Sequence, residues 1–449
     1  MDARLIDFYA KPVPRYTSYP TAPHFSEEVG TTTYKSWLSA VPEEQGISLY
    51  IHIPYCDRLC WFCGCNTKQT RQYAPVARYL DDLRMEVEAV ARALNGHGVV
   101  TALHFGGGSP TLLSPADLKS LDALLRTCFV FAPDAEISVE MDPNDMDEAR
   151  YDALADIGLT RASLGVQDFD LRVQQAINRL QSFEQTREVV DAVRLRGARS
   201  VNTDLLYGLP HQTVDSVLAT TEQILTLSPD RIALFGYAHV PWMKKHQTMI
   251  DESVLPDVQE RFVQQTAAAE RLVAAGYQPI GIDHFAKPQD SLAIAARERR
   301  LRRNFQGYTD DSALTLIGLG ASSIGQFAEG YVQNTPGSGD YRARVSEDGF
   351  ATVRGYRLRP EDRVRAHVIE KLMCGFGFSK SELFNRFGAQ ALPVIQDAGL
   401  LLATEPNGFF VSQGDEFVVP EVGRPFVRAI AAQFDSYLKA GKARHSIAV

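Results

Sequence analysis

The 449-residue chain has little cysteine, and most of what it has lies in one place. Six cysteines occur, and four of them fall within residues 56–65. A disulfide framework is typical of small domains in oxidising compartments, so a fold held together by disulfides is not expected here. The two remote cysteines, Cys128 and Cys374, sit among apolar residues and are predicted to be packing thiols.

The sequence also lacks long apolar runs and an excess of positive charge. No run approaches the length of a membrane span, and residues 1–7 show no basic stretch followed by an apolar segment, so we expect no membrane partner and no signal peptide. The net charge of −9 disfavours a nucleic-acid partner. A cytoplasmic location is therefore expected.

The clustered cysteines are the first positive signal. Cys56, Cys60 and Cys63 are spaced Cys-x3-Cys-x2-Cys. Such a loop can wrap one inorganic cluster and supply three thiolates, whereas a [4Fe–4S] cluster normally takes four, so one iron keeps an open position for a small molecule. Structural zinc is the alternative, but zinc sites usually show paired Cys-x2-Cys knuckles or Cys/His sets, and no second pair follows.

Strands and helices alternate through the middle of the chain. Six apolar or β-branched runs are predicted strands: Ile47–Ile53, Val99–Phe105, Glu136–Met141, Thr160–Val166, Val201–Leu206 and Arg231–Tyr237. Five segments have helical spacing: Tyr73–Leu94, Pro115–Phe129, Phe183–Arg196, Thr213–Leu227 and Val258–Ala275. This rhythm is typical of a parallel sheet built from βα units, and six units predict an α/β fold, an incomplete TIM-like (β/α)6 barrel.

Polar residues follow the predicted strands. In such barrels the chemistry sits at the carboxyl ends of the strands. The first strand runs from Tyr50 into the cysteine loop, and the second ends in Gly106–Thr111. The other four strands end in Glu140 and Asp142, in Gln167, in Asp204, and in Tyr237 with His239. We therefore expect a site where these ends converge.

Two glycine-rich segments accompany these strands. Gly106–Thr111 is not a P-loop, because no Gly-Lys-Ser/Thr follows. It is either a tight turn or a backbone that comes close to a ligand, as only glycine permits, and its position beside the cysteine loop favours the second interpretation. Gly318–Gly325 is weaker on its own, and a turn or close-packing site is the simpler interpretation.

The two ends of the chain differ from the barrel, which with its extension is assigned to residues 46–334. Residues 1–45 are rich in Pro, Tyr, Thr and Ser and are predicted to be an N-terminal arm without secondary structure of its own. Two interpretations stay open: plain packing on the surface, or a functional arm folded across the barrel mouth. Residues 335–449 are predicted to be a mostly helical, winged-helix-like C-terminal domain. Its expected elements are helices Arg363–Met373, Lys380–Phe387 and Leu392–Gly399, a hairpin of Leu401–Thr404 and Gly408–Val411, and a last helix from Pro425 to about Lys439.

Several motifs together resemble a known family. The cysteine spacing, with Phe62 just before the third cysteine, resembles the radical S-adenosylmethionine (SAM) superfamily. Over nearly its whole length the chain is similar to the oxygen-independent coproporphyrinogen III oxidases of haem biosynthesis. The matching segments are 15–21, 56–65, 106–111, 165–168, 204–210 and 303–309. Ser109 stands where threonine is expected, and both offer a hydroxyl.

The resemblance implies the cofactors and their contacts. Cys56, Cys60 and Cys63 match the ligands of a [4Fe–4S] cluster. The residues that match contacts of the cluster-bound SAM are Tyr50, Gly107, Glu140 and Ile324. A second SAM beside the first is also implied, and the residues that match its contacts are Phe62, Gly108, Ser109, Gln167, Arg179, Asp204 and Ala238. The division between the two SAM molecules is open, as is the role of Cys65, and no catalytic residue is assigned.

The implied reaction is oxidative decarboxylation of two propionates of coproporphyrinogen III to vinyl groups, giving protoporphyrinogen IX. It requires a low-potential electron donor, and the family favours a monomer. The alternative is a haem chaperone-like relative that binds haem without decarboxylation. Gly64-Cys65 after the third cysteine and the segment 303–308 favour the oxidase.

Basic side chains are candidates for binding the four propionates of this substrate. Arg15 and the run Arg299–Arg303 are the best placed in the sequence. Two interpretations of the run stay open: a solvated helix face with ordinary ion pairs, or a cationic wall for an acidic substrate.

Overall fold

The computed structural model describes residues 3–438 and contains the predicted incomplete barrel. Six neighbouring strands are parallel and follow one another in chain order. They are β1 (Gly46–Ile53), β4 (Val99–Gly107), β5 (Val130–Met141), β6 (Arg161–Gln167), β7 (Ser200–Tyr207) and β8 (Arg231–Gly236). In the described residues β8 does not pair with β1, so the barrel has an open side.

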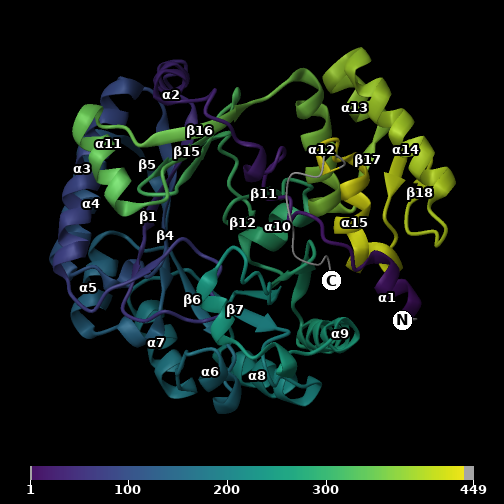
Figure 1. The fold of residues 1–449 in the computed structure, drawn as a ribbon, viewed down its shortest axis with the longest axis horizontal. Helices are drawn as coiled ribbons and strands as arrows, with labels where there is room; N and C mark the ends of the chain where they lie inside the picture. The colour runs from purple at the N-terminus through teal and green to yellow at the C-terminus, as the bar shows by residue number, and fades with distance from the viewer. Residues whose placement is uncertain (1–2, 439–449) are drawn as a thin grey trace.

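Helices cover the outside of this sheet, as Figure 1 shows. They are α3 (Ala74–Leu94), α4 (Pro115–Cys128), α5 (Glu148–Asp156), α6 (Leu171–Ala176), α7 (Phe183–Leu195), α8 (Val214–Leu227) and α9 (Val258–Ala274). Side-chain caps fix where several begin. The Ser114 hydroxyl, for example, accepts a hydrogen bond from the Asp117 backbone N–H at the start of α4.

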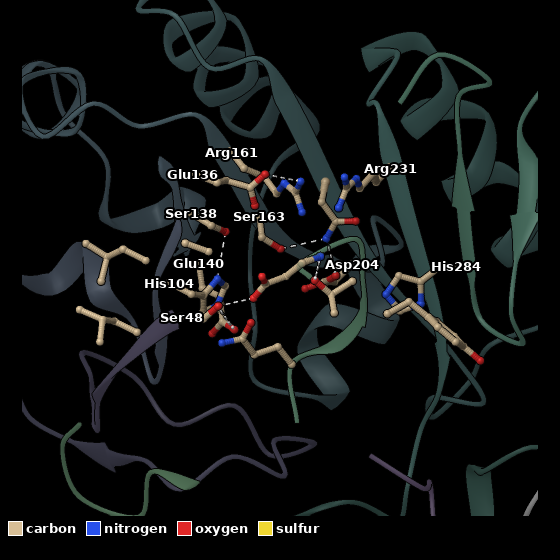
Figure 2. Close-up of a pocket in the computed structure, with 18 of the residues that line it drawn as sticks. Ser48, His104, Glu136, Ser138, Glu140, Arg161, Ser163, Asp204, Arg231 and His284 are labelled. Atoms are coloured by element: carbon tan, nitrogen blue, oxygen red, sulfur yellow. Dashed lines mark hydrogen bonds and ion pairs between the residues drawn. The ribbon is translucent and has the colours of Figure 1, made fainter. Parts of the chain in front are cut away.

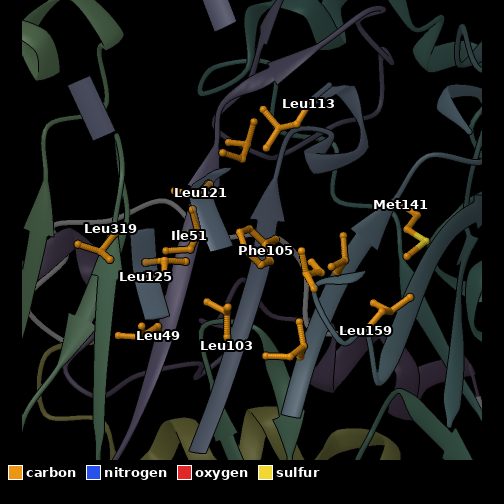
Figure 3. Close-up of a cluster of buried hydrophobic side chains, with 14 of the residues drawn as sticks. Leu49, Ile51, Leu103, Phe105, Leu113, Leu121, Leu125, Met141, Leu159 and Leu319 are labelled. Atoms are coloured by element: carbon orange, nitrogen blue, oxygen red, sulfur yellow. The ribbon is translucent and has the colours of Figure 1, made fainter. Parts of the chain in front are cut away.

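The main core lies between the strands and these outer helices. Figure 3 shows Ile51 of β1 and Phe105 of β4 beside Leu121 and Leu125 of α4. Alternate residues of each strand point the other way, into the barrel, and many of them are polar. Apolar packing therefore holds the barrel from outside and leaves its interior for polar groups.

The large sheet extends beyond the six barrel strands on both sides, which the sequence did not predict. Next to β1 lie β13 (Thr315–Leu319), β14 (Ile324–Gln326), β15 (Gly330–Asn334) and β16 (Thr352–Arg357), and next to β8 lie β10 (His284–Ala286) and β9 (Gln278–Ile280). The helix α11 (Ser338–Asp348) packs on α3. The domain boundary at residue 334 stays a prediction, although β16 pairs with β15 across it.

The open side of the barrel is covered by a hairpin. The short α10 (Ser291–Arg297) precedes β11 (Arg302–Asn304), which pairs with β12 (Gly307–Thr309). Tyr308 and Thr309 of this hairpin line the interior cavity. The segment that carries part of the sequence resemblance therefore lies next to the barrel interior.

The arm has helices of its own, so that prediction was wrong. They are α1 (Ala3–Tyr9) and α2 (Thr31–Ser39), whereas residues 15–21 form no helix or strand, as expected. Apolar side chains spread along the arm explain the difference, because Tyr9 and Tyr16 are buried in the core of the C-terminal helices. Figure 1 shows α1 beside that part of the chain.

The C-terminal elements form three helices and a three-stranded antiparallel sheet, and the assignment of residues 335–449 to a winged-helix-like domain stays a prediction. These elements are α12 (Pro360–Gly375), α13 (Lys380–Phe387), α14 (Leu392–Thr404), β17 (Gly377–Ser379), β18 (Val411–Gln413) and β19 (Glu416–Val418).

Two expectations for this region were wrong. Residues 401–404 are the end of α14 rather than a strand, because the leucine-rich run continues its helix up to Glu405. The hairpin is instead formed by β18 and β19. The last helix is short, since α15 (Val427–Ala431) lies between two 3₁₀ turns. Lys439, its expected end, lies outside the described residues. Among the described helices, none is both long and apolar enough to cross a bilayer.

The core predicts a stability difference between two leucines. Leu125 of α4 is fully buried, whereas Leu195 at the end of α7 is 85% exposed. Leu125→Ala should lower the free energy of unfolding by about 2–5 kcal/mol, because it leaves a cavity. Leu195→Ala should change it by less than about 0.5 kcal/mol. Denaturant unfolding of the two variants measures both values, and equal losses would contradict the packing described here.

Candidate active site

The cysteine loop leaves the carboxyl end of β1. A short parallel pair, β2 (Tyr55–Cys56) and β3 (Lys68–Gln69), closes its base. The three predicted ligands, Cys56, Cys60 and Cys63, are free thiols. Because their loop follows β1, the three cysteines lie at the carboxyl end of the barrel strands, where barrel enzymes carry their chemistry.

Polar groups surround these sulfurs. The Cys56 Sγ lies 3.0 Å from the Thr67 hydroxyl, and the Cys63 Sγ accepts a hydrogen bond from the Cys65 backbone N–H at 3.4 Å. Burial raises the pKa of the Cys56 thiol to about 12, so a thiolate there needs positive charge beside it, as iron supplies. Hydrogen bonds to the sulfurs are typical of iron–sulfur ligation.

This donor set fits a cluster with three protein ligands. Among residues 3–438, no group of three or more His, Cys, Asp or Glu side chains is arranged to hold a single metal ion. The fit to a cluster therefore rests on three free thiols in one loop and on the hydrogen-bond donors around them.

A second loop, which follows β8, is bound to the cysteine loop through backbone carbonyls. The buried Gln247 amide donates to the carbonyl oxygens of Phe62, at 2.9 Å, and Ala238, at 3.2 Å. The His246 Nε2 lies 2.7 Å from the Cys63 carbonyl oxygen. Gln247 thus brings together two predicted SAM contacts. Sequence reasoning missed it, because a single glutamine in a loop carries no signal.

Gly107, the last residue of β4, and Gly108 after it have no room for a side chain. Gly107 has a φ of +112°, and a Cβ there would lie 2.6 Å from the His52 ring. A Cβ at Gly108 would lie 2.5 Å from the Tyr55 carbonyl oxygen. The close backbone approach is therefore to the first strand and its loop, and the further approach to a ligand stays a prediction.

Glu140 is held as a carboxylate at the end of β5. Its Oε2 accepts a hydrogen bond from the Gly107 backbone N–H at 3.0 Å, and its Oε1 lies 3.2 Å from His104 Nε2. Burial raises the pKa of Glu140, but these partners outweigh burial and lower it. The side chain is surrounded by protein yet 41% exposed, because it faces the cavity. The Tyr50 ring stacks on His104.

Asp204 lies within β7, before its last residue Tyr207, and its pKa shifts in the opposite direction to that of Glu140. Burial raises its pKa to about 6; the hydrogen bond from Asn202 opposes this rise, and the charge of Glu140 adds to it. Asn202 Nδ2 donates to Asp204 Oδ1 at 2.8 Å, and the buried Asn202 Oδ1 has no partner. Two carboxylates and an unpaired amide oxygen fit a ligand with hydroxyl or ammonium donors.

Arg179 is already paired by the protein. Its Nη1 lies 3.1 Å from Asp142 Oδ2 and 3.6 Å from the Cys60 Sγ, and its Nη2 donates to the Gly165 carbonyl at 2.6 Å. Its buried Nε has no partner. Asp142, seen in the sequence only as a strand-end residue, is thus the carboxylate that holds Arg179 beside the cysteine loop. Pairing of Arg179 with a SAM carboxylate stays a prediction.

The remaining predicted contacts lie around the same strand ends. Gln167 ends β6 with a φ of +71°. The buried Ser109 hydroxyl donates to Asp145 Oδ2 at 2.6 Å, so the protein already uses it. Ile324 begins β14, and a Cβ at Gly318 would lie 2.7 Å from its carbonyl oxygen. This agrees with the interpretation of residues 318–325 as a close-packing segment.

An interior cavity of about 230 Å³ runs down the barrel from these strand ends. Figure 2 shows Glu140 and Asp204 beside this space. Further down, Arg161 and Arg231 each lie 3.6 Å from Asp310 Oδ1, which closes the lower end with ion pairs. The cavity is smaller than the ~300–1,000 Å³ of typical ligand pockets, so a tetrapyrrole does not fit within it.

The arginine run divides into two parts. Arg299 pairs with Glu416 and Arg300 with Glu298 on the exposed surface, as the solvated-face interpretation predicts. The Arg303 side chain is only 4% exposed. Only the end of the run therefore belongs to the interior of the protein.

Comparison with known proteins gives a consistent result. The radical SAM superfamily model matches residues 50–224. The chain is 47% identical to the oxygen-independent coproporphyrinogen III oxidase of Bradyrhizobium diazoefficiens, over 97% of both chains. It is 46% identical to that of Paracoccus denitrificans, over 97% of this chain and 96% of the relative.

A solved structure agrees over the whole fold. The coproporphyrinogen III oxidase of Escherichia coli, described as a radical SAM enzyme, superimposes with a TM-score of 0.91 at 39% identity, over 97% of this chain and 99% of the other. With the cysteine loop, the incomplete barrel and these full-length matches, the chain belongs to the oxygen-independent coproporphyrinogen III oxidase family of radical SAM enzymes.

Proposed function

We propose that the chain catalyses oxidative decarboxylation of coproporphyrinogen III to protoporphyrinogen IX in haem biosynthesis. The observation that carries the proposal is a three-cysteine loop at the carboxyl end of β1, contacted by Arg179 through Cys60, with Glu140 at the end of β5 bound to Gly107 of the neighbouring β4. The names and full-length similarity of the relatives support the same reaction.

In this proposal, Cys56, Cys60 and Cys63 hold a [4Fe–4S] cluster through their thiolates. With SAM bound and an electron from a low-potential donor, the cofactors supply a 5′-deoxyadenosyl radical that removes one hydrogen atom from the substrate. The chain holds these groups in place and keeps water away. Arg179 donates a hydrogen bond to the Cys60 sulfur, and Gln247 joins the cysteine loop to the loop after β8.

Each decarboxylation turns one propionate into a vinyl group. The propionate gives one hydrogen atom to the radical and releases one molecule of CO₂. It also gives up one electron, which passes to an external acceptor. Two propionates react and two remain in the product. The protein must therefore bind four carboxylates at first and two at the end.

The assignment of SAM contacts follows the chemistry of the strand ends. Glu140 is charged and accepts hydrogen bonds, so it suits an ammonium or a ribose hydroxyl. Asp204, beside the unpaired Asn202 Oδ1, suits a second set of hydroxyls. We propose two SAM molecules, with Tyr50, Gly107, Glu140 and Ile324 near the first. The residues proposed to contact the second SAM molecule are Phe62, Gly108, Ser109, Gln167, Arg179, Asp204 and Ala238.

The remaining assignments are also proposals. A cytoplasmic location suits free thiols and an oxygen-sensitive cluster. A monomer and an external low-potential donor follow from the family resemblance. A haem-binding role without decarboxylation is not favoured, because the curated relatives named above are all oxidases.

The proposed activity is tested by anaerobic reconstitution with iron and sulfide, followed by incubation with SAM, coproporphyrinogen III and a chemical low-potential reductant. We expect a divinyl product and 5′-deoxyadenosine. Haem binding without either product would favour the chaperone-like alternative.

The cluster assignment predicts a sharp difference between cysteines. Cys60→Ser should lose the cluster and SAM cleavage, because serine replaces a soft thiolate with a poor iron ligand. Cys128→Ser, remote from the loop, should keep both. Iron and sulfide analysis, together with circular dichroism to confirm folding, measures the outcome. A normal cluster content in Cys60→Ser would contradict the assignment.

The raised pKa of Asp204 predicts a pH dependence of SAM binding. Below a pH of about 6 the carboxyl is protonated and loses an ionised acceptor, whereas above it the carboxylate is present. The affinity for SAM should therefore fall as the pH decreases through this value. Losing a hydrogen bond to a charged group costs about 1.5–3 kcal/mol, at least tenfold in binding.

Asp204→Asn should bind SAM at least about tenfold more weakly at pH 8 and should lose this pH dependence. Asp152→Asn, on the exposed surface, is the matched control and should behave as the parent does. Equilibrium binding of SAM to the reconstituted protein at pH 5.5 to 8 measures both. Parental affinity and pH dependence in Asp204→Asn would show that Asp204 does not contact SAM.

A further inference from the structure

Four arginines from distant parts of the chain converge around Tyr207, the last residue of β7. They are Arg15 of the arm, Arg261 of α9, Arg303 of β11 and Arg428 of α15, called here the arginine cluster. A Cβ at Gly236 would meet the Tyr207 hydroxyl at 2.9 Å and Arg261 Nη2 at 3.2 Å, and Arg15 bonds the carbonyl of the same glycine. Burial raises the pKa of Tyr207, whereas the charges of Arg261, Arg428 and Arg15 lower it. Arg303 joins them, because its Nε donates to the Arg15 carbonyl at 3.3 Å.

The cluster is held in place largely by neutral partners. Arg15 Nη2 donates to the Gly236 carbonyl at 3.0 Å, and Arg261 Nη2 donates to the Tyr237 carbonyl at 2.8 Å. Arg428 Nη2 donates to a carbonyl of the arm at 2.9 Å. The two bonds of Arg15 and Arg261 orient their guanidiniums without neutralising their charge.

Among residues 3–438, Arg15, Arg261 and Arg303 bring more positive charge to this place than Asp283 brings negative charge. The negative charge of Asp283 raises the pKa of Arg15, Arg303 and Arg428, so one carboxylate interacts with three guanidiniums. The ion pair between Asp283 Oδ2 and Arg303 Nη2 is long, at 3.9 Å. Burial lowers the pKa of Arg428 to about 10, and the charges of Arg15 and Arg303 add to this effect. Buried like charges are costly unless an anion joins them.

Two donors of the cluster have no partner. The Nε of Arg261 and the Nη1 of Arg303 are buried and make no hydrogen bond in the described structure. Unpaired buried donors are rare in proteins, and they are expected where a ligand completes the site. An acceptor with negative charge would satisfy both the donors and the excess charge.

The cluster adjoins the interior cavity. Arg303 lies over the Tyr308 ring at 4.4 Å, and Tyr308 lines the cavity together with His284, Glu140 and Asp204. A molecule bound at the arginine cluster is therefore next to the strand ends where the radical chemistry is proposed.

We propose that the arginine cluster binds propionate carboxylates of the substrate and so positions one reacting propionate over the strand ends. This inference rests on the proposed function and adds the groups that select the substrate. Guanidinium suits the role because its planar fork bonds a carboxylate at two points. Arg299 and Arg300, paired on the surface, take no part.

The first test compares Arg15→Gln with Arg299→Gln in the full-length reconstituted enzyme. Arg15 is the suitable target, because it is the solvent-exposed member of the cluster and its loss leaves the cores intact. The KM for coproporphyrinogen III should rise at least about tenfold in Arg15→Gln, with SAM affinity unchanged and the surface variant equal to the parent. Arg15→Lys, which keeps the charge, should recover part of the loss. An unchanged KM in Arg15→Gln would overturn the proposal.

The second test separates carboxylate binding from support of the arm. Coproporphyrin III has four propionates and mesoporphyrin IX has two, so the ratio of their dissociation constants reports the carboxylates alone. The parent should prefer coproporphyrin III, and Arg15→Gln and Arg261→Gln should lose most of this preference. An equal weakening of both ligands would overturn the proposal, because it indicates only a displaced arm.

Failure of the proposed function is visible separately. A parent enzyme that forms no divinyl product disproves the oxidase activity, whatever the variants do. A parent that forms product, beside variants with parental KM and parental ligand preference, disproves only the role of the arginine cluster.

Discussion

The cost of burying charge inside the barrel governs the rest of this structure. Inward-facing positions of the six strands carry Glu140, Arg161, Asp204 and Arg231, which a closed apolar core could not accommodate. At the lower end the charges neutralise one another, as Arg231 does with Asp290 at 2.7 Å. At the upper end they do not, since the carboxylates face the cavity. This end is suited to ligands with hydrogen-bond donors, whereas the hairpin beside the cavity is itself held by an apolar cluster that includes Leu301 and Tyr308.

A buried polar network fixes the edge of the site from behind. Glu86 of α3 is fully buried, and burial raises its pKa to about 7. Its carboxylate accepts hydrogen bonds from the Gly320 backbone N–H, the Asn334 amide and the Tyr341 hydroxyl. It thus binds α3 to the segment before Ile324 and to α11. Such networks are stable only when every member is satisfied, so this one fixes the extended sheet in a single arrangement.

The sequence was sufficient for the barrel because hydrophobic periodicity and polar strand ends are local signals. It also identified the cysteine loop, Glu140 and Asp204, whose positions follow from strand order. It missed the helices of the arm, because their apolar side chains pack against distant parts of the chain: those of α1 in the core of the C-terminal helices and those of α2 in the core of the barrel. It missed Gln247 and the pairing of Asp142 with Arg179, because both are contacts between side chains on separate loops that no local pattern reveals. Likewise, the Arg299–Arg303 run has one composition but two environments, which only tertiary packing separates.

The N-terminal arm is bound directly to the arginine cluster. Its backbone carbonyls accept hydrogen bonds from Arg303 and Arg428, two members of the arginine cluster, and its own Arg15 is a third. Docking of the arm and binding of carboxylates therefore draw on the same cations. If the arginine cluster binds the substrate as proposed, the substrate lies outside the interior cavity, where the arm, the hairpin of β11 and β12, and α15 meet. A substrate carboxylate in that place would balance guanidinium charge that Asp283 alone does not balance, and it would bind to an arm that the same arginines already hold in position.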